Sequence, residues 1–158
     1  MPTVKPANKK NLKKIAHINL SCFHGSANLK ESLKWVFCNF RAFPRFQYFV
    51  IKEKNILGYI LWYFKGGWRK ESILELEQVA IDPKYQDKGF GTRLIKESLK
   101  QLNIFLKKDS RRIKALIVTT GSTQKAQKIY EKVLGARPEA RIKKLFREDE
   151  IILIKRFK

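Results

Sequence analysis

The sequence predicts a mixed α/β domain with a largely antiparallel central sheet and helices on its faces. Three observations support this prediction. Apolar residues recur at helical spacing near the N-terminus, a strand pair follows, and strand-like segments then alternate with helix-like ones. The chain has 158 residues, of which 44% are hydrophobic. It is therefore expected to form one domain over residues 1–158, with a core that needs no disulfide or metal.

The N-terminal part of the chain predicts an arm, two helices and a β-hairpin. Met1–Pro6 is expected to be a short strand or an extended arm. Apolar residues at helical spacing predict helices over Asn11–Phe23 and Leu29–Phe40, the second of which ends before a proline. β-branched and aromatic residues gather in Tyr48–Ile51 and Ile56–Phe64, and a polar tetrapeptide separates these two segments. This arrangement predicts a hairpin.

A long strand is expected after the turn at Gly66-Gly67. Ile73–Ile81 alternates apolar and polar residues and then loses the alternation at Val79–Ile81. The loss predicts a bulge or a change of burial. Asp82-Pro83 ends the strand, because proline has no N–H group to donate to a neighbouring strand.

The rest of the chain predicts two more helices, a buried strand and a final hairpin. Thr92–Leu106 has the apolar spacing of an amphipathic helix, and Gln124–Leu134 has similar spacing. Ile113–Val118 is apolar except at Lys114, which we take as typical of a strand buried on both faces. Arg141–Phe146 and Glu150–Phe157 are expected to pair as a closing hairpin around an acidic turn.

The charge balance favours anionic partners. The net charge is +21, and the basic residues are spread over the whole length. This distribution favours a solvated surface over a dedicated nucleic-acid site, although a basic nucleic-acid-binding or ribosome-associated module is an alternative. The first twenty residues lack the apolar core of a signal peptide, and no apolar run is long enough to span a bilayer. We therefore expect a cytoplasmic protein with no membrane partner.

The two cysteines, Cys22 and Cys38, lie near two histidines, His17 and His24. Core thiols, a disulfide and metal ligands are all open interpretations of such a group. The spacing contains no CxxC or HxxxH pair, so it matches no compact zinc pattern. We expect reduced thiols and no metal site.

The segment Gln86–Thr92 (QDKGFGT) has the features of a phosphate-binding turn between a strand and a helix. Gly89 and Gly91 lack Cβ atoms, so the backbone can approach a ligand closely. The N–H groups from Lys88 to Thr92 can form an anion-binding nest, and the N-terminus of the helix adds further donors. A purely structural turn would fit the same two glycines.

Two common nucleotide-binding loops do not fit this segment. A P-loop needs Gly-Lys followed by Ser or Thr, but here Gly91 is followed by Thr92-Arg93. A dinucleotide-binding loop needs a third glycine where this chain has Leu94.

The surroundings of the turn resemble the GNAT superfamily of acetyl-CoA-dependent N-acetyltransferases. The similar residues are Val79–Pro83, the pattern Gln86-x-x-Gly89-x-Gly91 with the amphipathic helix after it, and Ala126-x-x-x-Tyr130-Glu131-Lys132 followed by Gly135. The chain departs from the family in having Thr123 where an asparagine is usual and Ala136 where an aromatic residue is common.

The resemblance implies a GNAT fold with a mixed, mostly antiparallel sheet, acetyl-CoA as acyl donor and a primary amine as acceptor. The acceptor would be a protein N-terminus, a lysine or a small amine, and we expect a monomer or a homodimer. A GNAT-like sensor that binds acyl-CoA without catalysis is an alternative. The residues that the resemblance assigns to the cofactor are Val79, Ile81, Gln86, Asp87, Lys88, Gly89, Phe90, Gly91, Thr92, Thr123 and Ala126.

The resemblance also implies catalytic roles. An amine of pKa about 10.4 is protonated near neutral pH, so a general base is useful. Glu77 is the candidate base and Glu75 the reserve, although Glu77 could equally be a solvent-facing strand residue. The family's tyrosine that protonates the departing thiolate corresponds to Tyr130, which would also fit as a core tyrosine. The backbone N–H groups of Val79 and Ile81 would be donors to the thioester carbonyl.

Overall fold

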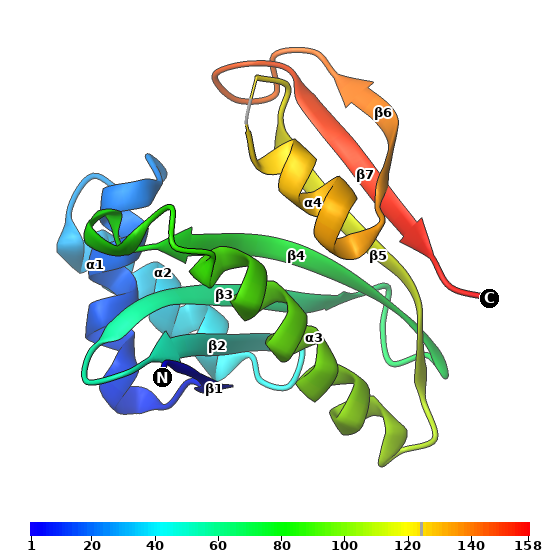
Figure 1. Ribbon diagram of the computed structural model, residues 1–158, viewed down its shortest axis with the longest axis horizontal. Coiled ribbons are helices and arrows are strands. Elements are labelled where there is room, and N and C mark those ends of the chain that lie inside the picture. Colours follow the sequence, from blue (N-terminus) through cyan, green and yellow to red (C-terminus); the bar gives the residue numbers. More distant parts are fainter. Residues whose placement is uncertain (124) are drawn as a thin grey trace. The chain divides into compact units, whose positions relative to one another are not determined.

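A computed structural model of the chain describes residues 1–123 and 125–158 (Figure 1). Seven strands form one sheet in the order β1-β2-β3-β4-β5-β7-β6. The pairs β1–β2, β5–β7 and β6–β7 are antiparallel, and β4–β5 is parallel. The elements in chain order are β1 (Thr3–Pro6), the 3-10 helix η1 (Lys9–Asn11), α1 (Leu12–Cys22), α2 (Leu29–Arg41), β2 (Phe46–Lys52), β3 (Ile56–Lys65), β4 (Glu71–Ile81), the 3-10 helix η2 (Pro83–Tyr85), α3 (Phe90–Lys107), β5 (Arg112–Gly121), α4 (Ala126–Leu134), β6 (Arg137–Ile142) and β7 (Glu150–Arg156).

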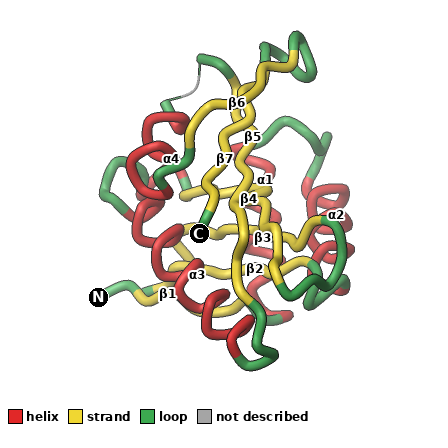
Figure 2. The backbone as a smooth tube through the Cα atoms, turned by 90° about the vertical axis from the view of Figure 1, so that its right-hand side faces the viewer, coloured by secondary structure: helices red, strands yellow, loops and turns green. Residues whose placement is uncertain are grey.

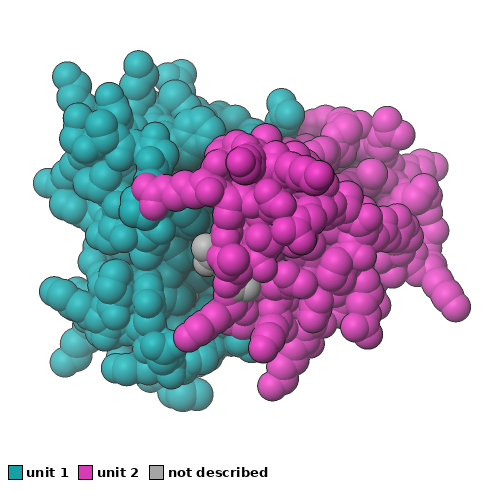
Figure 3. Space-filling view, turned by 90° about the horizontal axis from the view of Figure 1, so that it is seen from above, with its two compact units in different colours: residues 1–62, 78–100 teal, residues 63–77, 101–158 magenta. Residues whose placement is uncertain are grey.

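The chain divides into two compact units, which Figure 3 distinguishes by colour. The first unit contains residues 1–62 and 78–100, and the second contains residues 63–77 and 101–158. Because β3, β4 and α3 each contribute residues to both, the units are interleaved in sequence.

In the first unit, α1 and α2 lie side by side on one face of strands β1 to β3, and α3 lies on the other (Figures 1 and 2). Asn28 begins α2 by accepting a hydrogen bond from the Glu31 N–H, as expected of an N-cap. On the other face, the Trp62 indole N–H donates to the Ser98 hydroxyl of α3 at 2.9 Å. The core beneath α1 and α2 consists of Leu12, Ile15, Ala16, Ile18, Val36, Tyr48, Val50, Ile56, Tyr59, Leu61 and Ala80.

Close contact between β3 and the end of β4 depends on Gly58. A Cβ atom built on Gly58 would lie 2.4 Å from Ile81 Cδ1 and 2.6 Å from the Ala80 carbonyl oxygen. Beside this contact, the Asp82 backbone N–H donates a hydrogen bond to the Leu57 carbonyl at 2.8 Å. Because Gly58 has no side chain, β3 can approach the end of β4 closely. This approach positions the strand end that precedes the predicted phosphate-binding turn.

In the second unit, β5 pairs with β4 on one side and β7 on the other, and α4 packs against β5 and β7. The prediction that β5 is buried on both faces is wrong. Ile113, Leu116 and Val118 are buried, whereas Ala115 and Ile117 on the opposite face are only half-buried. The strand therefore alternates in burial, with a more accessible apolar face.

The remaining predicted elements are confirmed, with corrections to their boundaries. The first strand of the closing hairpin is Arg137–Ile142 and not Arg141–Phe146, because Leu145 and Phe146 lie exposed in the loop that follows it. Helix α3 begins at Phe90, two residues before its predicted start. The register shift between β4 and β5 lies at Ser72/Ile73. A bulge at Val79–Ile81 stays a prediction.

Three further expectations concern the thiols, a metal site and membrane spans. Cys22 and Cys38 are free thiols, half-buried and exposed respectively, and no group of potential metal ligands occurs in residues 1–123 and 125–158. No helix in this described part is long and apolar enough to cross a membrane. Gln124, the first residue of one predicted helix, lies outside the described residues.

Candidate active site

The turn between β4 and α3 has a backbone that few side chains tolerate. Asp87 and Gly89 have φ values of 61° and 76°, in the left-handed region. The Gln86 side-chain amide donates to the Ile81 carbonyl at 2.9 Å, which fixes the start of the turn. The Arg93 N–H donates to the Gly89 carbonyl at 3.1 Å, closing the first helical turn of α3.

This geometry leaves donors at the start of α3. Because α3 begins at Phe90, the N–H groups of Phe90, Gly91 and Thr92 belong to its first turn, where no preceding helical carbonyl can accept them. A Cβ atom on Gly89 would meet nothing within 4 Å, so space for a ligand is open there. Backbone donors, the positive end of the helix dipole and open space together fit a phosphate group.

Cationic side chains surround the same turn. The Lys88 ammonium lies 5.8 Å from the centre of the Tyr85 ring, a cation–π arrangement. Arg93 pairs with Glu97 at 2.6 Å, so its charge is partly compensated within the helix. Lys88 is therefore the cation of this turn that remains available to a phosphate.

The end of β4 is held by two hydrogen bonds to one carbonyl group. The Ile81 carbonyl accepts hydrogen bonds from Gln86 and from the Cys22 thiol, the latter at 3.5 Å. Burial, together with the negative charge of Asp82, raises the pKa of the Cys22 thiol. Val79 and Ile81 are both half-buried. The structure thus brings Ile81 and the turn together, while the donor role of the two N–H groups stays a prediction.

A polar network in the first unit was not predicted from the sequence. The Asn19 side-chain amide donates to the Tyr59 hydroxyl at 2.9 Å and to the side-chain oxygen Oε1 of Gln78 at 3.2 Å. The Tyr59 hydroxyl donates to the same Gln78 oxygen at 2.9 Å, and Ser32 donates to Asn19 at 2.9 Å. Burial raises the pKa of Tyr59 well above 10.0. The network ties α1, α2 and β3 to the residue that directly follows Glu77.

In the second unit, Glu75 and Glu77 share one side of β4 but differ in their contacts. Glu75 is buried, accepts a hydrogen bond from the Tyr63 hydroxyl at 2.6 Å and pairs with the Lys65 ammonium at 2.8 Å. Glu77 reaches solvent, and among the described residues no hydrogen bond or ion pair engages its carboxylate. Desolvation by nearby protein atoms, followed by the charge of Glu75, raises the pKa of Glu77.

The predicted residues in and before α4 also lie in the second unit. Tyr130 is 7% exposed, and burial raises its pKa to about 12. In the described part of the chain no hydrogen bond engages its hydroxyl. Ala126 is half-buried at the first residue of α4. Thr123 is exposed and donates a hydrogen bond to Glu148. The helix ends at Gly135, whose φ of 65° forms a left-handed cap.

The predicted site residues therefore form two groups. The first unit holds Val79, Ile81 and the whole Gln86–Thr92 turn, and the second holds Glu77, Tyr130, Thr123 and Ala126. Sequence patterns identified the turn because glycine spacing is local. They could not identify the Asn19 network, whose members are up to 59 residues apart.

Comparisons with known proteins bear on the family and the fold of the chain. The model of the acetyltransferase (GNAT) family matches residues 12–136. Among solved structures, a GNAT-family protein from Desulfovibrio desulfuricans has a TM-score of 0.79 at 16% identity, with 99% of each chain covered. The ribosomal-protein-S18-alanine N-acetyltransferase of Escherichia coli has a TM-score of 0.75 at 21% identity, covering 99% of this chain and 94% of that one.

A mutant of the spermidine N-acetyltransferase from Vibrio cholerae has a TM-score of 0.78 at 18% identity, covering 98% of this chain and 93% of that one. No curated protein matches the sequence. At these identities the solved structures are evidence of a shared fold. Because the family model spans residues 12–136, which include the β4–α3 turn, the chain belongs to the acetyltransferase (GNAT) family, whose acyl donor is acetyl-CoA.

Proposed function

We propose that the chain transfers an acetyl group from acetyl-CoA to a primary amine by direct attack of the amine. The acceptor is a protein N-terminus, a lysine or a small amine. The observation that carries this proposal is the left-handed turn at Asp87 and Gly89, after which α3 begins with backbone N–H groups that have no acceptor within the helix. Such a turn suits the diphosphate of coenzyme A. The match to the GNAT family supports acetyl transfer as the reaction.

The residues Gln86–Thr92 would hold the diphosphate, with backbone N–H groups at the start of α3 and the Lys88 ammonium as donors. Thr123 and Ala126 are proposed as further contacts of the cofactor. When bound, acetyl-CoA supplies its acetyl group as a thioester, which a neutral amine can attack.

Glu77 is proposed as the general base. An amine of pKa about 10.4 must lose a proton before it attacks, and a carboxylate with a raised pKa is better matched to that proton than an ordinary one. The raised pKa of Glu77 supports this role, as does the lack of any hydrogen bond or ion pair to its carboxylate among the described residues. Glu75 is a weaker candidate, because its carboxylate already binds Tyr63 and Lys65.

Two further groups are proposed to assist. The backbone N–H groups of Val79 and Ile81 would stabilise negative charge on the carbonyl oxygen, since fixed donors are effective at such a position. The Tyr130 hydroxyl would donate a proton to the departing coenzyme A thiolate. Its pKa of about 12 keeps it protonated throughout the neutral range.

The net charge of the chain narrows the range of acceptors. A net charge of +21 repels polycationic molecules at long range. The fold itself does not choose between acceptors, since similar structures include a ribosomal-protein alanine N-acetyltransferase and a spermidine N-acetyltransferase. We therefore rank singly charged amines and protein N-termini above polyamines.

The proposal is tested by measuring free thiol released from acetyl-CoA with a panel of amines. The panel should include an N-terminal peptide, an amino sugar, a lysine peptide and spermidine. Glu77→Gln is expected to bind acetyl-CoA like the wild type but to release thiol about 100-fold or more slowly. Tight acetyl-CoA binding without turnover by the wild type on any amine would instead support a sensor.

A further inference from the structure

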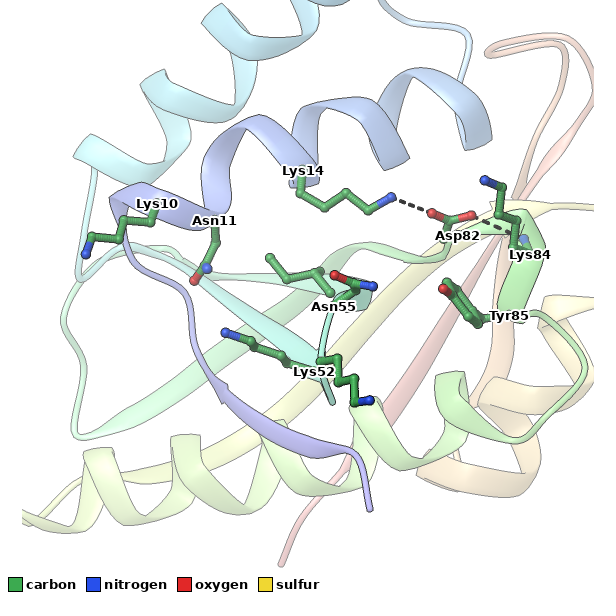
Figure 4. Close-up of a pocket in the computed structure, with 10 residues that line it drawn as sticks. Lys10, Asn11, Lys14, Lys52, Asn55, Asp82, Lys84 and Tyr85 are labelled. Carbon is green, nitrogen blue, oxygen red and sulfur yellow. Dashed lines mark hydrogen bonds and ion pairs between the residues drawn. The ribbon is translucent and has the colours of Figure 1, made fainter.

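A cavity of about 580 Å³ lies in the first unit, beside the cofactor turn and outside it. Its walls come from three places in the fold: η1 with the start of α1, the β2–β3 hairpin, and η2 (Figure 4). The residues that line it are Lys10, Asn11, Lys14, Lys52, Lys54, Asn55, Ile56, Asp82, Lys84 and Tyr85.

The cavity is strongly positive. Five of its lining residues are lysines, and only one, Asp82, is acidic. Lys14 pairs with Asp82 at 2.6 Å, and this contact lowers the pKa of Asp82. Among the described residues no ion pair engages the other four lysines. Five positive charges and one negative charge therefore leave four uncompensated ammonium groups around one cavity.

The backbone that carries these lysines is fixed by local contacts. The Asn8 side chain accepts from the Lys10 N–H, and Asn11 accepts from the Asn8 N–H, which together form a capping box around η1. The Asp82 carboxylate accepts from the Lys84 N–H at 3.2 Å. Since like charges repel, elements that place four lysines without an ion pair in the lining of one cavity gain stability when an anion binds between them.

We propose that this cavity binds a small anion that carries two or more phosphate groups. Lysine ammonium groups bind phosphate as point charges, and the volume is in the range of small-molecule sites. Tyr85 is the one aromatic residue among those that line the cavity, and it is half-buried. A single-stranded nucleic acid would be expected to need a series of aromatic platforms, so a small phosphorylated molecule is favoured over RNA.

The proposed anion site goes beyond the transfer reaction and uses different residues from the cofactor turn. The cavity ends at Tyr85, and the turn begins with the next residue, Gln86. Tyr85 lines the cavity, and Lys88 of the turn lies 5.8 Å from the centre of its ring. The two sites are therefore adjacent, and an experiment must separate them.

The test is calorimetric titration of the full chain with tripolyphosphate in the presence of saturating acetyl-CoA. The wild type is expected to bind tripolyphosphate. Because acetyl-CoA already fills the cofactor site, this binding would report on the cavity. The double variant Lys52→Gln with Lys54→Gln should bind tripolyphosphate about tenfold or more weakly, since two charge-assisted contacts are lost. Its affinity for acetyl-CoA should be unchanged.

A matched control is Lys30→Gln with Lys34→Gln, which removes the same charge from exposed positions on α2. This control should keep the wild-type affinity for tripolyphosphate. An equal loss in both double variants would overturn the proposal, because it would reveal attraction by overall charge alone. Competition between tripolyphosphate and acetyl-CoA would also overturn it, as would tight binding of a single-stranded RNA by a protein that does not bind tripolyphosphate.

Discussion

The Lys65 ammonium lies 2.8 Å from the Glu75 carboxylate, one of whose oxygens also accepts a hydrogen bond from Tyr63. Glu77 follows two residues later on the same side of β4. The pKa of Glu77 is raised first by desolvation and then by Glu75, and Lys65 opposes this shift. The pair therefore adjusts the pKa of the proposed base, after desolvation has raised it.

This arrangement predicts opposite effects of two substitutions on the Glu77 pKa. Glu75→Gln removes a negative neighbour and frees Lys65, so the pKa should fall. Lys65→Met removes the opposing positive charge, so the pKa should rise. Carbon-13 NMR titration of the Glu77 carboxyl group measures both shifts. Glu71→Gln, at an exposed ion pair farther along β4, is the control and should change little. Shifts in the reverse directions would refute the electrostatic assignment.

Gly58→Ala should destabilise the fold by about 3 kcal/mol, because the added methyl group would overlap Ile81 and the Ala80 carbonyl. Urea unfolding measures the loss. Gly25→Ala is a suitable control, since a Cβ atom there meets nothing within 4 Å. Equal stabilities for the two variants would mean that β3 and the end of β4 are not in close contact.

Tyr59→Phe should cost about 1 to 3 kcal/mol of unfolding free energy. The change removes the hydroxyl that bonds Asn19 and Gln78 and leaves buried polar atoms without that partner. Replacing Asn19 by Leu in the same background should then cost less than it does in the wild type, because the two residues share one network. Additive losses would contradict the shared network.

Tyr130 should contribute a pH-dependent part of the stability. Burial raises its pKa from 10.0 to about 12, so its contribution is fully present below pH 10 and is lost as the pH rises to 12. The unfolding free energy of the wild type relative to Tyr130→Phe should therefore fall by about 2 to 3 kcal/mol over that window. Urea unfolding at pH 9 and pH 12 measures this change. A constant difference would indicate a phenol of ordinary pKa.

Much of the fold could be predicted because its signals are local. Helical spacing in Leu29–Phe40 and strand composition in Ile56–Phe64 each identified an element to within a few residues of its ends. The β6 strand could not be placed because all of its residues are exposed, so no buried face imposes alternation on Arg137–Ile142. The apolar residues Leu145 and Phe146 suggested a strand but lie in the loop.

The candidate site likewise has features that could be predicted from the sequence and features that could not. The glycine spacing, the strand end before it and the helix after it are all local in the sequence, so the Gln86–Thr92 turn could be predicted. By contrast, the difference between Glu75 and Glu77 depends on Tyr63 and Lys65, which come from another strand. The lysine cavity likewise joins η1, the β2–β3 hairpin and η2, and no pattern along the chain indicates that they meet.

The assignment of the β4–α3 turn to acetyl-CoA is tested most directly by the affinity of Gly89→Glu for this cofactor, measured by calorimetry beside Gly67→Glu. Both glycines have left-handed φ values, 76° and 92°, and a Cβ atom on either meets nothing within 4 Å, so the two variants are matched in strain and charge. We predict that Gly89→Glu is folded and has no measurable affinity, whereas Gly67→Glu binds like the wild type. Wild-type affinity in Gly89→Glu would contradict the assignment.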